Sequence, residues 1–87
     1  MPRLPSRIDA ATAIAFGARL KRIRLANPAH PSQDAVAHAA GLTTSSYCRY
    51  EQGRGTPSLA TLWSIASVLN VQPGDLLNDD ADDQAIA

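Results

Sequence analysis

The segment from Ser32 to Gly53, SQDAVAHAAGLTTSSYCRYEQG, limits the fold of this chain more than any other part. Ser32 is a good N-cap for a helix that begins at Gln33 and runs to about Ala40, because its hydroxyl can accept a hydrogen bond from a free backbone N–H. Gly41 suits the left-handed residue that ends such a helix. The chain is therefore expected to turn sharply at this glycine.

A second short helix is expected directly after that turn. Thr43 can cap a helix that begins at Thr44 and runs to about Gln52, where the glycines of QGRG end it. Two helices joined by so few residues must cross, and Ala37 is small enough to let their axes approach closely. This is the geometry of a helix-turn-helix, in which the second helix lies in the major groove of DNA. The apolar residues that such a crossing would bury are Val36, Ala40, Leu42, Tyr47 and Tyr50.

Another helix is expected before this pair, from a cap at Asp9 to about Ala26. Phe16, Leu20 and Ile23 recur at the spacing of one helical face and form an apolar stripe. The prolines of the following NPAHP segment prevent the helix from continuing. We therefore expect this helix to pack against the pair that follows it.

Two more helices complete the expected fold. Ser58 can cap a fourth helix, and Pro73 suits the first turn of a short fifth helix that carries Leu76 and Leu77. No stretch shows the sustained alternation that strands require, so the fold class is predicted to be all-α, a compact bundle of five helices. The fourth helix is expected to bury one apolar side, made of Leu59, Leu62, Ile65, Ala66 and Leu69.

The formal net charge of zero conceals a strong asymmetry along the chain. All eight basic residues lie within the first 54 positions, where only three acids oppose them, so that part carries a formal charge of +5. The remainder has five acids and no base, and carries −5. The basic part could be a surface for a polyanion, and it could equally be the solvated face of ordinary helices.

Length and composition exclude several classes of function. A chain of 87 residues is expected to form one small domain, too small for the two-lobed clefts of most cofactor enzymes, so binding is the better expectation. No apolar run approaches the roughly 20 residues of a membrane span, and the N-terminus has no signal-peptide core, so we expect a cytoplasmic protein without membrane contact. The single cysteine cannot form an internal disulfide.

The order of these features resembles the phage-repressor and Cro-like (xenobiotic-response-element type) helix-turn-helix family of bacterial transcriptional regulators. The resemblance covers about Phe16 to Leu77 and implies a five-helix DNA-binding domain of the lambda-repressor-like type at 14–78. It leaves 1–13 as an N-terminal arm with the start of the first helix, and 79–87 as an acidic tail. The matching features are Ser32-Gln33, Ala37, Gly41, the YEQG of Tyr50 to Gly53, Pro57-Ser58, and IASVLNV followed by DLL.

The resemblance implies which residues contact DNA. Thr44, Ser45 and Arg49 match the positions that read bases, and an arginine can make a bidentate contact to guanine O6 and N7. The alternative is that these three residues only form the capped, solvent-exposed start of a helix. The residues expected to hold backbone phosphates are Gln33, Thr43, Gln52, Arg54 and Arg19, with Arg22 as a further candidate. Gln33 could instead be only a capping residue. The arginines of the first helix could instead be solvated.

Two further roles are structural. In this family an arginine on the first helix typically pairs with the glutamate of the E-x-G element, which implies a pair between Arg24 and Glu51. Trp63 is either core filler or, because the family commonly dimerises through its fourth and fifth helices, part of a homodimer interface. Arg3 and Arg7 in the arm could enter a minor groove or have no role in binding.

No cofactor or metal is expected. His30, His38 and Cys48 do not have the spacing of a zinc site, and the DDADDQ tail lacks the glycine and the terminal glutamate of a calcium loop. Cys48 has no second cysteine or basic cluster to support a thiol switch.

The sequence therefore predicts a non-enzymatic, sequence-specific regulator that binds double-stranded DNA as a dimeric repressor of an inverted-repeat operator. One alternative is an antitoxin that represses its operon and also binds a toxin through the same fold. Another is a protein-interaction module that has kept the fold and lost DNA binding.

Overall fold

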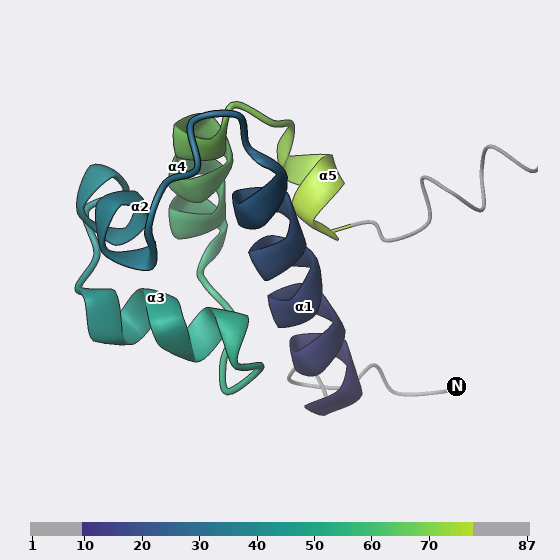
Figure 1. Ribbon diagram of the computed structural model, residues 1–87. Coiled ribbons are helices and arrows are strands. Elements are labelled where there is room, and N and C mark those ends of the chain that lie inside the picture. Colours follow the sequence, from purple (N-terminus) through teal and green to yellow (C-terminus); the bar gives the residue numbers. More distant parts are fainter. Residues whose placement is uncertain (1–9, 78–87) are drawn as a thin grey trace, which may run out of the picture.

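The protein is described by a computed structural model for residues 10–77, and within these residues the chain forms helices and no strand (Figure 1). The all-α prediction is thus confirmed, as is the number of five helices. Asp9, the arm residues Arg3 and Arg7, and the tail 79–87 lie outside the described residues. The helices are α1 (Ala10–Ala26), α2 (Gln33–Ala39), α3 (Thr44–Glu51), α4 (Leu59–Leu69) and α5 (Pro73–Leu77).

Three hydroxyl side chains begin α2, α3 and α4 where the sequence predicts them. Ser32 accepts a hydrogen bond from the amide N–H of residue 35 at 3.0 Å, Thr43 from that of residue 46 at 3.1 Å, and Ser58 from that of residue 61 at 3.2 Å. Gly41 has a φ of 77°, the left-handed conformation expected of it. The ends of α2 and α3 differ from the prediction by one residue, because Ala40 and Gln52 are the C-caps of these helices.

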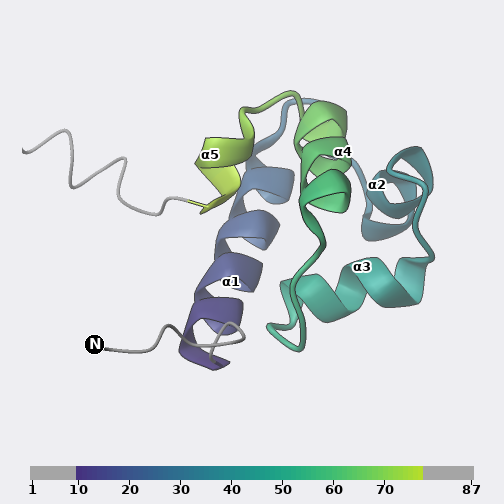
Figure 2. The ribbon, with the colours of Figure 1, turned by 180° about the vertical axis from the view of Figure 1, so that it is seen from behind.

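The helices enclose one hydrophobic core at the centre of the bundle. α2 packs against both α3 and α4, α1 packs against α3 and α5, and α4 packs against α5. Figures 1 and 2 show α3 lying below α2 and α4 and beside α1, so that one long side of α3 faces outward. The buried core residues are Phe16, Leu20, Val36, Ala37, Tyr47, Leu62, Ile65, Ala66, Leu69 and Leu76.

The prediction that Leu59 is buried is wrong, since 68% of this residue is exposed. Leu59 begins α4 and lies one turn before Trp63, which is itself 56% exposed. Residues four apart share a helical face, so Leu59 belongs to the outer side of α4 with Trp63 rather than to the buried side with Leu62. The apolar side of α4 is therefore narrower than its sequence suggests.

Gly17 allows α1 to approach the end of α3 closely. A Cβ atom at this position would overlap the carbonyl oxygen of Tyr50 and would lie 2.7 Å from that of Glu51 and 2.9 Å from the amide nitrogen of Gly53. Backbone atoms at these distances cannot move aside as a flexible side chain can. No role for Gly17 is predicted above, although a glycine inside a helix often marks such a close approach.

We predict that Gly17→Ala destabilises the protein by about 1–3 kcal/mol or more, because α1 must shift away from α3 to make room for the methyl group. Thermal and denaturant unfolding measure this effect. Gly74→Ala is the matched control, since a Cβ there would meet nothing within 4 Å. A Gly17→Ala variant as stable as Gly74→Ala would contradict the close packing of α1 on α3.

Candidate nucleic-acid interface

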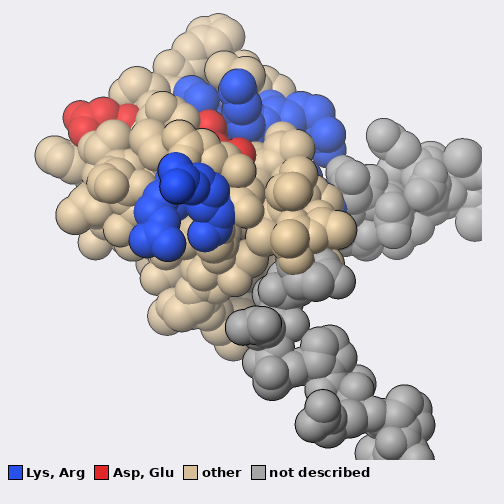
Figure 3. All heavy atoms as spheres, turned by 90° about the horizontal axis from the view of Figure 1, so that it is seen from below, with Lys and Arg blue, Asp and Glu red and all other residues tan. Residues whose placement is uncertain are grey.

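The outward side of α3 carries polar side chains that are not used within the fold. Ser45 and Arg49 are both exposed, and neither side chain forms a hydrogen bond with another residue in the range 10–77. Figure 3 views the molecule from the side where α3 lies and shows basic side chains in two groups on this face. A long, polar and partly basic helix surface of this kind can enter the major groove of DNA.

The two threonines at the start of α3 are engaged with neighbouring residues. Thr43, besides capping the helix, donates its hydroxyl to Ser46 Oγ at 3.0 Å. Thr44 donates its hydroxyl to Asp34 Oδ1 in the first turn of α2. The sequence predicts no role for Asp34 beyond its charge, because nothing in the local sequence indicates a bond between residues ten positions apart.

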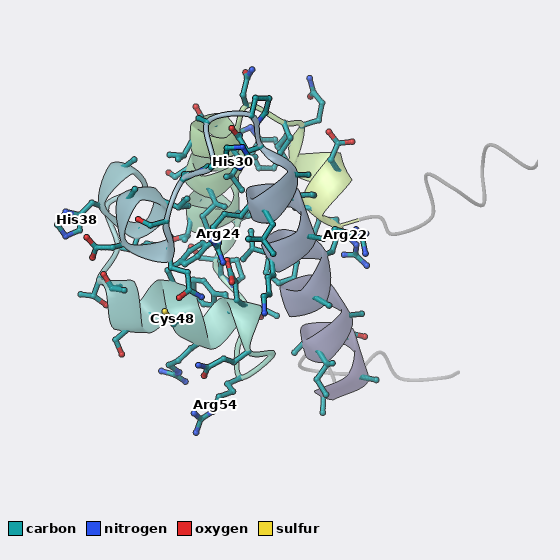
Figure 4. All side chains as sticks on the ribbon, in the orientation of Figure 1. Arg22, Arg24, His30, His38, Cys48 and Arg54 are labelled. Carbon is teal, nitrogen blue, oxygen red and sulfur yellow. The ribbon has the colours of Figure 1, made fainter. Side chains whose placement is uncertain are left out.

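Arg54 and Gln52 extend this surface past the end of α3. The backbone N–H of Arg54 donates to the carbonyl of Arg49 at 2.9 Å, which folds the chain back under the helix. The guanidinium of Arg54 lies 3.5 Å from Gln52 Oε1, and Figure 4 shows it pointing away from the bundle beyond α3. Both residues are exposed, so they are available to an anion.

A buried ion pair fixes the orientation of α3. Arg24 Nε of α1 donates to Glu51 Oε2 of α3 at 2.6 Å, and Arg24 Nη2 donates to Glu51 Oε1 at 3.1 Å, so the pair is bidentate. Arg24 also donates to the carbonyl of Pro31 at 3.2 Å, and Gln33 Nε2 of α2 donates to Glu51 Oε1 at 2.9 Å. We call Arg24, Gln33 and Glu51 the brace, since together they tie α1 and α2 to α3. Figure 4 shows Arg24 pointing inward between these helices.

The brace keeps both of its charges despite burial. Burial acts to raise the pKa of Glu51, but the hydrogen bonds that its carboxylate accepts, led by that from Arg24, lower this pKa below the ordinary value. The hydrogen bond to Glu51 raises the pKa of Arg24. Because the pKa of Glu51 is lower in the folded chain, the pair stabilises the fold at neutral pH, and this stabilisation is lost as the pH falls through that lowered pKa.

Tyr47 lies against the brace and is fully buried. Its hydroxyl has no hydrogen-bond partner among residues 10–77, and burial raises the pKa of this phenol far above its ordinary value, with Glu51 adding to the effect. The sequence predicts that Tyr47 is buried in the crossing of α2 and α3, but it does not predict the contact with the ion pair. The phenol of Tyr47 therefore stays neutral beside the ion pair.

The expectation that Arg19 holds a DNA phosphate is wrong. Arg19 is buried, and its Nη1 donates to the carbonyl of Leu76 at 2.6 Å, which fastens α5 to α1. The sequence contains a signal for the burial of Arg19. Residues three apart share a helical face, and Phe16, three residues before Arg19, is in the core. Figure 4 shows Arg22 on the side of α1 that faces away from α3.

The side chain of Gln33 also forms a hydrogen bond within the fold. Its side-chain amide donates to Glu51, so at least one of its donors serves the brace rather than a phosphate. The phosphate contact of Gln33 stays a prediction, with the backbone N–H at the start of α2 as the donor.

The remaining candidates are scattered. Figure 4 places His30, His38 and Cys48 on three separate parts of the molecule, and residues 10–77 contain no group of three or more His, Cys, Asp and Glu side chains that could hold a metal ion. Trp63 is an exposed residue of α4. Across the same part of the chain, no helix has both the length and the apolar character that crossing a bilayer requires.

The sequence of the chain matches the HTH_3 helix-turn-helix family model over residues 20–76. This match includes α2 and α3 with the turn between them. The chain belongs to the Cro/C1-type helix-turn-helix family. The helix-turn-helix expected from the sequence is therefore present in this chain.

Two similar proteins are regulators of related kinds. The chain is 37% identical over 62 residues to the SPbeta prophage-derived HTH-type transcriptional regulator YonR of Bacillus subtilis (strain 168), a match that covers 71% of this chain and 56% of the relative. The chain therefore corresponds to little more than half the length of that protein. The fold is also similar to the crystal structure of the restriction-modification controller protein C.AhdI from Aeromonas hydrophila, with a TM-score of 0.71 and 31% identity, over 77% of this chain and 94% of that one.

We predict that Glu51→Ala lowers the free energy of unfolding by about 3–5 kcal/mol, because it leaves the guanidinium of Arg24 buried without its partner. Thr44→Ala removes only a bond at the surface, so its effect should be about 0.5–1.5 kcal/mol. Denaturant unfolding of the two variants at neutral pH compares them directly. Equal stabilities would mean that the ion pair does not hold the helices together.

Proposed function

We propose that this protein is a sequence-specific regulator that binds double-stranded DNA, represses transcription, and reads an inverted-repeat operator as a homodimer. The observation that carries this proposal is the state of Arg49, which is exposed on the outward side of α3 and whose guanidinium has no hydrogen-bond partner within residues 10–77. An arginine held on a fixed helix is suited to a bidentate contact with guanine O6 and N7. The names of the relatives, a prophage-derived transcriptional regulator and a restriction-modification controller protein, support the same conclusion.

In this proposal the residues of the interface have different tasks. Ser45 and Arg49 contact base edges with side-chain groups that form no hydrogen bond within the fold. Thr44 contacts a base with the lone pairs of its hydroxyl oxygen, because its hydroxyl hydrogen is bonded to Asp34. Gln33, Thr43, Gln52 and Arg54 hold phosphates on either side of α3 and thereby fix its position in the groove. The brace keeps α3 at one angle to the rest of the domain, so that these contacts can form together.

A homodimer would explain the outer side of α4. Leu59 and Trp63 lie one turn apart there, and both are more than half exposed. A tryptophan in such a position is a common anchor of protein interfaces. Two copies joined through this side would bring two α3 helices about 34 Å apart, one turn of DNA, which is what an inverted repeat requires.

The first expected result concerns DNA itself. Selection from a random duplex library should enrich a two-fold symmetric motif, and affinity for it should fall steeply as the salt concentration rises. We predict that Arg49→Ala weakens binding by about 1–3 kcal/mol and relaxes the preference at one position of each half-site. Arg49→Lys should lose the same preference but keep most of the salt dependence, because lysine retains the positive charge but lacks the paired N–H donors of the planar guanidinium.

Failure of the folded wild-type protein to enrich any sequence would contradict DNA binding. The fold would then serve as a protein-interaction module. An antitoxin role would instead leave DNA selection intact and add a co-purifying protein partner.

The second expected result concerns assembly. We predict that sedimentation of the wild-type protein over a range of concentrations reveals a dimer, and that Trp63→Ala shifts it toward the monomer. Leu25→Ala is the matched control, because Leu25 is 55% exposed, close to the 56% of Trp63, but lies on α1. A wild-type protein that stays monomeric at all concentrations would contradict the dimer.

A further inference from the structure

We propose that Asp34 sets the base preference at one operator position by holding the Thr44 hydroxyl so that it can only accept a hydrogen bond from DNA. The inference rests on the proposed DNA-binding function and adds a positioning residue to it. Its basis is the hydrogen bond that Thr44 Oγ1 donates to Asp34 Oδ1. Asp34 itself is placed on α2, outside the helix that is expected to enter the groove.

The bond joins the starts of two helices at the exposed surface. Asp34 is the second residue of α2 and is exposed, while Thr44 is the first residue of α3 and is half-buried. The carboxylate has no hydrogen on either oxygen, so Asp34 can only be the acceptor in this pair. The direction of the bond therefore follows from the chemistry of the two side chains.

A threonine hydroxyl has one proton and two acceptor lone pairs. Free in solution it can rotate to suit either a donor or an acceptor on a base, and so it discriminates poorly. While the Thr44 hydroxyl donates its hydrogen bond to Asp34, only the lone pairs of its oxygen are left to contact DNA. Among the base edges of the major groove, amino groups are the donors, and these belong to cytosine (N4) and adenine (N6). Guanine and thymine present only acceptors in the major groove: O6 and N7 of guanine, and O4 of thymine. An acceptor on the base would face the acceptor oxygen of Thr44, and no hydrogen bond could form.

This arrangement complements Arg49 on the same helix. Arg49 has only donors and is suited to a base that presents acceptors, whereas the paired Thr44 has only acceptors and is suited to a base that presents donors. Ser45, with a hydroxyl that is not engaged, has neither restriction. One helix therefore carries three readers of different hydrogen-bond character, and Asp34 is what distinguishes Thr44 from Ser45.

An acidic residue in the first turn of a helix also stabilises that helix through its dipole. This role would make Asp34 matter for stability and leave base preference unchanged. The two roles are separated by a measurement of preference rather than of affinity or melting temperature alone.

The test is selection from a random duplex library with the full chain in five forms: wild type, Asp34→Ala, Thr44→Val, the double variant, and Thr44→Ser. We expect the wild type to favour cytosine or adenine over guanine or thymine at one position of each half-site, by about 5- to 150-fold, the usual effect of one wrong base pair. Asp34→Ala should reduce this ratio to about one, since the freed hydroxyl can also donate. Thr44→Ser keeps the hydroxyl and should keep the preference.

The double variant shows whether Asp34 acts through Thr44. Asp34→Ala should change the base preference in the wild-type background and leave it unchanged in the Thr44→Val background. Thermal unfolding of each variant checks that it is folded. A preference that survives Asp34→Ala would overturn the inference while the proposed function stands, and so would an equal effect of Asp34→Ala in both backgrounds. If the wild type enriches no sequence, it is the proposed function that fails.

Discussion

The buried ion pair between Arg24 and Glu51 is the interaction on which the rest of this structure depends. A net gain in stability is not what makes it important, because the desolvation of two charges offsets much of their attraction. Its importance lies in geometry: a bidentate contact between a planar guanidinium and a carboxylate allows one relative orientation of α1 and α3. Gln33 adds α2 to the same carboxylate, so a single side chain of α3 is held by two other helices.

The consequence for function is a division of polar groups between the inside and the outside of α3. Glu51 and the ring of Tyr47 face inward and serve the fold, whereas Ser45 and Arg49 face outward with their polar groups unused. The close contact at Gly17 allows α1 to support α3 without covering that outer side. The helix can therefore be held firmly by the protein and still offer a free surface to a partner.

Local sequence determined the helices and their limits well, because the signals involved act over three or four residues. The hydroxyl caps at Ser32, Thr43 and Ser58 and the left-handed Gly41 are of this kind. The pair of Arg24 with Glu51 was implied only by the family resemblance.

What the sequence could not indicate were contacts between distant segments, since these depend on how the helices pack. Arginines usually lie at the surface, which favours a surface position for Arg19, yet its side chain reaches the backbone of α5. The apolar side chain of Leu59 favours a position in the core, yet no neighbouring helix covers it enough to bury it.

The central claim is that α3, held by the brace, is the surface that meets DNA. The most direct test follows the backbone amide resonances of the protein by NMR while its selected duplex is added. The account predicts that the largest changes occur from the start of α2 through α3 to Arg54, with small changes on the outer side of α4. Large changes confined to α4 and α5, with α3 unaffected, would contradict it.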